Sequence, residues 1–154
     1  MTETVEARLA NLGIELPSPA APAANYVPYV FSGNQLFISG QLPMGTDGLE
    51  HIGKLGDELS VGEGKAAAKL CAINLLAQAK AATGDLEKVA RLVKIVGFVN
   101  STADFTQQPQ VINGASDFLV QAMGDKGRHA RSAVSAASLP FGAAVEIEAI
   151  FEIA

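Results

Sequence analysis

The chain has 154 residues, of which 49% are hydrophobic and 18% charged, and its formal net charge is −5. This length predicts a single domain with a two-layer core, and the acidic balance argues against binding a nucleic-acid backbone. Because typical soluble domains carry about 25% charged residues, the low charged share favours an oligomer over an isolated monomer.

The cysteine and histidine content limits the location and the cofactors. Cys71 is the one cysteine, which excludes an intramolecular disulfide framework and fits a reducing compartment. No segment reaches the roughly 18 apolar residues of a membrane span, and the acidic N-terminus lacks the apolar core of a signal peptide. We therefore expect a soluble, cytoplasmic protein. His51, His129 and Cys71 are too scattered for a zinc site of known spacing, so no metal is expected.

The N-terminal segment is expected to form a short helix and a connector. Apolar residues at helical spacing predict a helix over residues 4–12 that ends at Gly13. Its apolar stripe would consist of Val5, Leu9 and Leu12. Residues 17–25 are rich in proline and alanine, which is typical of an extended linker.

A β-hairpin is predicted after the linker. Its strands would lie near residues 29–31 and 36–39, joined through residues 32–34, which contain a glycine and an asparagine. Pro28 confines the first strand to a sheet edge because proline lacks a backbone N–H. The glycine-rich residues 44–59 predict an ordered but irregular loop.

A long helix is predicted after the glycine-rich loop. Ser60 and Glu63 fit a capping box that opens a helix running to about Ala82 and stopping at Gly84. Its single cysteine, Cys71, is then expected to be a buried structural thiol rather than a nucleophile.

The second half of the chain predicts a strand, a helix and a final hairpin. Residues 91–101 are β-branched and aromatic, as in a central strand. A helix is expected over about 109–123, with a proline near its start and Gly124 as its stop. Two strands around Leu139-Pro140-Phe141-Gly142 would close the chain. The order ββαβαββ predicts an α+β fold, with one mixed sheet and two helices packed on one face.

The final hairpin poses the question of Arg131. A turn centred on Pro140-Phe141 places Arg131 opposite Ile150, on the same face as three glutamates. These glutamates are Glu146, Glu148 and Glu152. Geometry alone favours a surface ion pair of Arg131 with Glu148 or Glu152, worth about 0.2–1 kcal/mol. The alternative is that an oligomer buries this face and the guanidinium binds a small carboxylate through two hydrogen bonds.

Several short motifs, taken in order, resemble the reactive intermediate deaminase family, also called the YjgF or endoribonuclease L-PSP family. They are Val27-Pro28-Tyr29-Val30, Ile38-Ser39-Gly40-Gln41-Leu42-Pro43, Ile112-Asn113-Gly114, Ala130-Arg131-Ser132, Leu139-Pro140 and Val145-Glu146-Ile147-Glu148. The resemblance covers residues 26–154, so residues 1–25 would be a separate N-terminal helix and linker. It implies a chorismate-mutase-like α+β fold of the bacillus type, assembled as a homotrimer with a central β-barrel and clefts between subunits.

The resemblance also implies a reaction and a site. The arginine at the Arg131 position would anchor the carboxylate of a 2-imino or enamino acid, and the glutamate at the Glu146 position would orient the attacking water. The products would be ammonia and a 2-oxo acid. The residues that match the cleft lining are Tyr29, Ser39, Gly40 and Asn113. An imine already hydrolyses in water, so positioning and a directed water suffice and no cofactor is expected.

Two positions depart from the family pattern. Ala133 stands where the common branch carries a cysteine, and Ser116 stands where an aromatic residue usually follows the cleft asparagine. These departures leave open a second hypothesis, a non-catalytic trimer that binds small carboxylates or acts as a holdase. A third hypothesis, an endoribonuclease, follows from the family's older name, but the net charge of −5 argues against an RNA site.

Overall fold

The computed structural model describes residues 3–19 and 24–154. Its helices are α1 (Val5–Asn11), α2 (Val61–Thr83) and α3 (Gln108–Met123), with 3-10 turns at Leu86–Lys88, Gly124–Gly127 and Pro140–Gly142. Its strands are β1 (Tyr29–Ser32), β2 (Gln35–Gln41), β3 (Met44–Gly45), β4 (Gly48–Leu49), β5 (Val89–Asn100), β6 (Ala130–Ala136) and β7 (Val145–Ile153). One 5-stranded mixed sheet has the order β1-β2-β7-β5-β6, and β3 pairs separately with β4.

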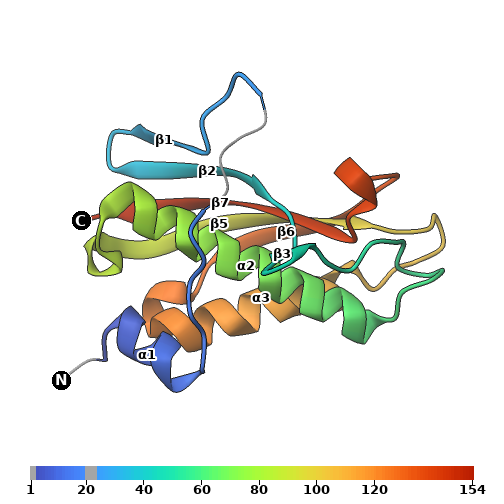
Figure 1. Ribbon diagram of the computed structural model, residues 1–154, viewed down its shortest axis with the longest axis horizontal. Coiled ribbons are helices and arrows are strands. Elements are labelled where there is room, and N and C mark those ends of the chain that lie inside the picture. The colour runs from blue at the N-terminus through green and yellow to red at the C-terminus, as the bar shows by residue number, and fades with distance from the viewer. Residues whose placement is uncertain (1–2, 20–23) are drawn as a thin grey trace.

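The helices α2 and α3 lie side by side on one face of this sheet, as Figure 1 shows. Alternate residues of β2 and β7 point into the layer between sheet and helices and are almost fully buried. These core residues are Leu36, Ile38, Val145, Ile147, Ala149 and Phe151. The predicted α+β fold, with one mixed sheet and two helices on one face, is confirmed.

The face of the sheet away from the helices, called the open face below, carries both apolar and acidic side chains. The strand registers place on it Phe37, Val96, Phe98, Val134, Glu146, Glu148 and Ile150. Phe37 is 40% exposed and Val134 is 44% exposed. A single copy of the chain therefore leaves large apolar side chains of its sheet in contact with water.

The first hairpin forms as predicted. Strands β1 and β2 pair in an antiparallel register that sets Tyr29 opposite Ile38. The turn between them contains Gly33, whose φ of 60° is in the left-handed region that favours glycine. Strand β1 is at the edge of the sheet, consistent with Pro28 immediately before it.

The glycine-rich segment 44–59 is ordered and largely irregular, but it contains a small hairpin that the sequence did not predict. Strands β3 and β4 pair through Met44 with Leu49 and Gly45 with Gly48. Further along, isolated bridges join Ile52 to Ala143 and Leu55 to Ser101. These contacts fasten the segment to the ends of the main sheet.

Helix α2 begins and ends where its sequence predicts. The Ser60 hydroxyl accepts a hydrogen bond from the Glu63 backbone N–H at 3.2 Å, and the Glu63 carboxylate accepts from the Ser60 N–H at 3.1 Å. These bonds satisfy two backbone donors at the first turn and lower the pKa of the Glu63 carboxyl. Gly84 ends the helix in a left-handed conformation.

Strand β5, helix α3 and strand β6 form a β-α-β unit. Strand β5 is an interior strand, as expected, and it pairs in parallel with β6 on one side. Helix α3 starts with a proline in its first turn and ends at Gly124, as predicted. It provides the crossover that parallel strands require.

The predicted final hairpin is wrong. Strand β7 already pairs with β2 on one side and β5 on the other, so β6 cannot pair with it. Instead β6 occupies the outer edge of β5, and Arg131 lies opposite Ile95 rather than Ile150. The 3-10 turn Pro140–Gly142 leads the chain past the end of β5, where the Asn100 N–H donates to the Ala144 carbonyl at 2.8 Å.

The N-terminal helix packs against the domain. Helix α1 begins after the Thr4 cap and contacts α3 (Figure 1). Val5 and Leu9 are buried as predicted, whereas Leu12 is 41% exposed because the helix ends before it can reach the core. Of the predicted linker, residues 20–23 lie outside the described residues.

Candidate functional site

Arg131 lies on the helix-covered side of the sheet, at the edge formed by β6. Its Nη1 donates to the Ser116 hydroxyl at 3.1 Å and its Nη2 donates to the Pro109 carbonyl at 3.3 Å. A guanidinium has five N–H donors, so these two bonds fix its direction and leave donors for a ligand. Asn113 lines the same hollow of about 260 Å³, together with Ser116, Val120, Arg128 and His129.

The ion pair that strand geometry favoured is wrong. None of the ion pairs among residues 3–19 and 24–154 involves Arg131. The reason is the pairing of β6. Arg131 lies opposite Ile95 and shares its core-facing side of the sheet, whereas Glu148 lies opposite Val96 on the open face. The arginine is thus neither satisfied by Glu148 or Glu152 nor free in solvent.

Glu146 lies on the open face, in contact with Gly40. A β-carbon built at Gly40 would collide with the Glu146 carboxylate, so the close approach requires glycine at this position. Partial burial raises the pKa of the Glu146 carboxyl, and the neighbouring Glu148 charge raises it further. A carboxylate with a raised pKa is a stronger base than an ordinary one and so accepts a proton more readily.

Ser39 and Gly40 lie in a β-bulge of β2. Ile38 is opposite Ala149 and Gln41 is opposite Ile147, so two residues of β2 face one residue of β7. The Ser39 hydroxyl donates to the Val27 carbonyl at 3.3 Å. A glycine inside an otherwise regular strand is the sequence signal for such a bulge, and our strand assignment did not use it.

Tyr29 lies at the opposite edge of the sheet from Arg131. It is set opposite Ile38 on β1 and packs against the margin of the core. Its ring meets the Phe31 ring edge to face, with centroids 6.2 Å apart. In the sheet order, β1 and β6 are the two edges.

One copy of the chain therefore divides the six predicted site residues among different places. Asn113 and Arg131 share the hollow at the β6 edge, while Gly40 and Glu146 meet on the open face. The sheet separates these two pairs. Three further polar residues of the hollow, Ser116, Arg128 and His129, were not predicted as site residues. The signals available were the helical spacing of Ser116 from Asn113 and the strand spacing of His129 from Arg131.

Cys71 is buried in the core, as expected for a structural thiol. Its Sγ is 3.6 Å from the Val145 carbonyl oxygen. Burial raises the pKa of the thiol well above its usual range, and the Glu146 charge adds to this effect. A thiol without access to solvent and with a raised pKa is a poor nucleophile.

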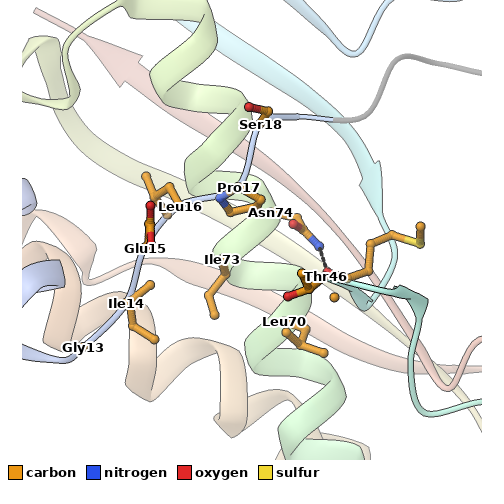
Figure 2. Close-up of a pocket in the computed structure, with 12 residues that line it drawn as sticks. Gly13, Ile14, Glu15, Leu16, Pro17, Ser18, Thr46, Leu70, Ile73 and Asn74 are labelled. Atoms are coloured by element: carbon orange, nitrogen blue, oxygen red, sulfur yellow. Dashed lines mark hydrogen bonds between the residues drawn. The ribbon is translucent and has the colours of Figure 1, made fainter.

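A larger groove lies on the helix side of the molecule and contains none of the six predicted site residues. Figure 2 shows residues 13–18 running beside α2, with Asn74 and Ile73 on the helix. The volume of this groove is about 700 Å³. The Asn74 amide donates to the carbonyls of Leu42 and Met44, each at 3.1 Å, and so ties α2 to the end of β2.

Neither a membrane span nor a metal cluster is present in the part of the chain that the structure describes. No helix there combines the length and apolar character needed to cross a bilayer. Within the same residues, no three side chains from His, Cys, Asp and Glu gather as metal ligands would.

Comparison with known proteins identifies the family. Residues 6–152 match the family model described as "YjgF/chorismate mutase-like, putative endoribonuclease". Protein TCP17 of Trypanosoma cruzi is 54% identical over 150 residues, which cover 97% of this chain and 94% of that protein.

Two solved structures extend this likeness to the fold. The protein Atu1372 of Agrobacterium tumefaciens, of unknown function, is 50% identical, with a TM-score of 0.92 over 97% of this chain and 92% of its own. A structure from Shewanella oneidensis, described as a putative endoribonuclease, is 35% identical, with a TM-score of 0.95 over 98% of this chain and 100% of its own. The chain belongs to the YjgF/chorismate-mutase-like family, which is the reactive intermediate deaminase family that its motifs resemble.

Proposed function

We propose that three copies of the chain associate and that the clefts between them hydrolyse 2-imino and enamino acids to 2-oxo acids and ammonia. The observation that carries this proposal is the separation of Arg131 from Glu146 by the sheet of one copy. A carboxylate anchor and a general base must both reach a small substrate. With the two groups on opposite faces, the partner of each must come from another copy.

The surface composition supports the association. The open face exposes Phe37 and Val134, with the half-buried Phe98 and Ile150 between them. Burying such apolar side chains against other copies is favourable, and only 18% of the residues are charged. A trimer closed around the open faces would form the central barrel of the family.

The Arg131 side supplies the anchor. Its remaining N–H donors suit the two parallel bonds that a carboxylate accepts from a guanidinium. The Ser116 and Pro109 contacts hold the guanidinium in place before a substrate arrives. Asn113, which lines the same hollow, provides an amide for the neighbouring polar atoms of the substrate.

The Glu146 side supplies the base. In the proposed reaction the Glu146 carboxylate accepts a proton from a water whose oxygen attacks C2 of the protonated imine. The tetrahedral adduct then transfers a proton to its nitrogen, the C–N bond breaks and ammonia leaves, while C2 becomes the 2-oxo carbon. The raised pKa of Glu146 suits this exchange of protons. Ser39, Gly40 and Tyr29 would shape this half of the cleft.

The test uses unstable imines that an enzyme generates in the assay mixture. Purified protein is added to a dehydratase that generates 2-iminopropanoate or 2-iminobutanoate, and release of the 2-oxo acid is followed. We expect the wild type to accelerate release and Arg131→Ala to lose this effect. If the wild type releases 2-oxo acid no faster than Arg131→Ala, the proposed activity is absent.

The second candidate is a trimer that binds small carboxylates without turnover. The observation favouring it is Ala133, which packs at the margin of the core and leaves the site without the cysteine of the common branch. Binding of a 2-oxo acid that Arg131→Ala abolishes, with no acceleration of imine hydrolysis, would select this function.

The name of the Shewanella structure suggests ribonuclease activity as a third candidate. RNA cleavage that survives further purification but is lost in Arg131→Ala would select that function instead.

A further inference from the structure

Three polar side chains in the Arg131 hollow are arranged in a chain of hydrogen bonds, and the proposed deamination uses only the bond between Arg131 and Ser116. The Ser116 hydroxyl and His129 Nε2 are 2.9 Å apart, and His129 Nδ1 is 2.6 Å from the Gly127 carbonyl oxygen. Arg131 Nη1 donates to the same hydroxyl at 3.1 Å. Ser116 comes from α3, whereas His129 immediately precedes β6.

The Gly127 carbonyl fixes the tautomer of His129. A carbonyl oxygen only accepts hydrogen bonds, so the hydrogen of a neutral imidazole must be on Nδ1. Nε2 then carries a lone pair directed at Ser116. The Ser116 hydroxyl consequently donates its hydrogen to Nε2, and its oxygen lone pairs remain for Arg131 and for the hollow.

Ser116 thus has a base on one side and a cation on the other. The base can accept the hydroxyl proton, and the Arg131 guanidinium stabilises negative charge that develops on the oxygen. A nucleophile within hydrogen-bond reach of a base, with the base oriented by a third group, is the arrangement that activates serine in acyl transfer. Here the orienting group is the Gly127 carbonyl.

We infer that Ser116 is a nucleophile, that His129 is its general base and that the hollow hydrolyses small acyl esters. The Ser116 oxygen attacks the ester carbonyl carbon while its proton passes to His129 Nε2. The C–O bond to the alcohol then breaks, and the alcohol takes that proton as it leaves. Water attacks the acyl-serine, His129 accepts its proton and returns it to the Ser116 oxygen, and a carboxylic acid is released.

This activity shares Arg131 with the proposed deamination but differs from it in the other residues it needs. All three groups come from one copy of the chain, and Glu146 has no part in the steps. The hollow has a volume of about 260 Å³ and opens to the surface, so a small acyl ester can reach Ser116. The same hydrogen bonds also join β6 to α3, so they could serve the fold alone. A purely structural contact would not make Ser116 reactive toward an electrophile.

The test is covalent labelling of the full-length protein with phenylmethanesulfonyl fluoride. The serine oxygen forms a bond to sulfur, fluoride leaves with the bonding electrons, and His129 accepts the proton. We expect one sulfonyl group per chain, located on Ser116 by peptide mass mapping, and no such product in Ser116→Ala. Ser132→Ala, which changes an exposed serine on β6, should be labelled like the wild type.

His129→Asn tests the base, and His51→Asn is its matched control because the sequence has 2 histidines. Asparagine tolerates the positive φ of 58° at residue 51. We expect His129→Asn to slow labelling at least about tenfold and His51→Asn to leave it unchanged, with circular dichroism confirming that both fold. An unmodified wild type, or equal labelling of Ser116 in His129→Asn, would overturn the inference.

Discussion

The α-carbon of Gly40 lies where only a hydrogen atom fits beneath the carboxylate of Glu146. The contact joins the bulge of β2 to β7, so the position of the proposed base depends on a residue that has no side chain. A small displacement of a catalytic group costs much of the rate, because the reacting atoms must be aligned.

Gly40→Ala should therefore reduce imine hydrolysis by about 10² while the fold persists, because only the flexible end of the half-buried Glu146 side chain has to move. The rate is measured by 2-oxo acid release and the fold by thermal melting. Gly45→Ala is the matched control, since a β-carbon there would meet the Glu50 carboxylate in a similar way outside the proposed cleft. Equal losses of rate in both variants would contradict a specific role for the Gly40 contact.

The pH dependence of the reaction should follow the ionisation of Glu146. Its carboxyl must be ionised to accept a proton from water, so kcat/KM should fall as the pH decreases through its raised pKa. Because the Glu148 charge contributes to that raised pKa, Glu148→Gln should move the fall to lower pH. Glu152→Gln, on the same strand and face, is the control and should leave the profile in place. A profile that is the same in all three proteins would refute the assignment of Glu146 as the base.

Stability should change with pH in a defined direction at the same residue. A carboxyl whose pKa is higher in the folded than in the unfolded chain favours the fold when protonated, and this contribution is lost as the pH rises through the folded pKa. Glu146→Gln should therefore raise the free energy of unfolding at neutral pH. The gain should disappear below the ordinary pKa of glutamate, as urea unfolding at several pH values will determine. A lower free energy of unfolding of Glu146→Gln at neutral pH would contradict the burial of this charge.

Local chemistry in the sequence predicted the helices well. The capping box of Ser60 and Glu63 satisfies backbone N–H groups at the start of α2, and a proline lies in the first turn of α3. Gly84 and Gly124 end these two helices. Such signals do not depend on the rest of the fold. The helix boundaries therefore follow from the sequence to within about one or two residues.

The neighbour of β6 could not be obtained in the same way. Alternation along a strand tells which residues share a face, but it does not tell which strand lies beside it. The strand-helix-strand order of β5, α3 and β6 was the available clue, because a crossover helix is typical of parallel strands. The motifs of the family indicated which residues form the site. That Arg131 and Glu146 lie on opposite faces of the sheet became visible only from the observed strand order.

Gly114 follows the proposed site residue Asn113 because α2 and α3 approach each other there. A β-carbon at Gly114 would collide with the backbone of Lys65 on α2. Gly114→Ala should lower the free energy of unfolding by about 1–3 kcal/mol, measured by urea unfolding. Gly62→Ala is the matched control, because its β-carbon would have no contact closer than 3.8 Å and alanine favours the helix. Equal effects at the two positions would mean that the helices separate easily.

Mixing two inactive variants tests whether the proposed cleft takes its halves from different copies. Arg131→Ala keeps Glu146, and Glu146→Gln keeps Arg131, so each variant alone lacks one half of every cleft. If the variants are unfolded together in equal amounts and refolded, a cleft is complete only when it combines one half from each. Random assembly should then restore about a quarter of the wild-type rate of imine hydrolysis.

The control is the same mixture of separately refolded variants, which should stay inactive until subunits exchange. Should the co-refolded mixture remain inactive while size-exclusion chromatography shows normal assembly, Arg131 and Glu146 do not meet between copies. The separation of these residues by the sheet would then exclude their joint action on one small substrate, because neither a single copy nor an assembly would bring them together.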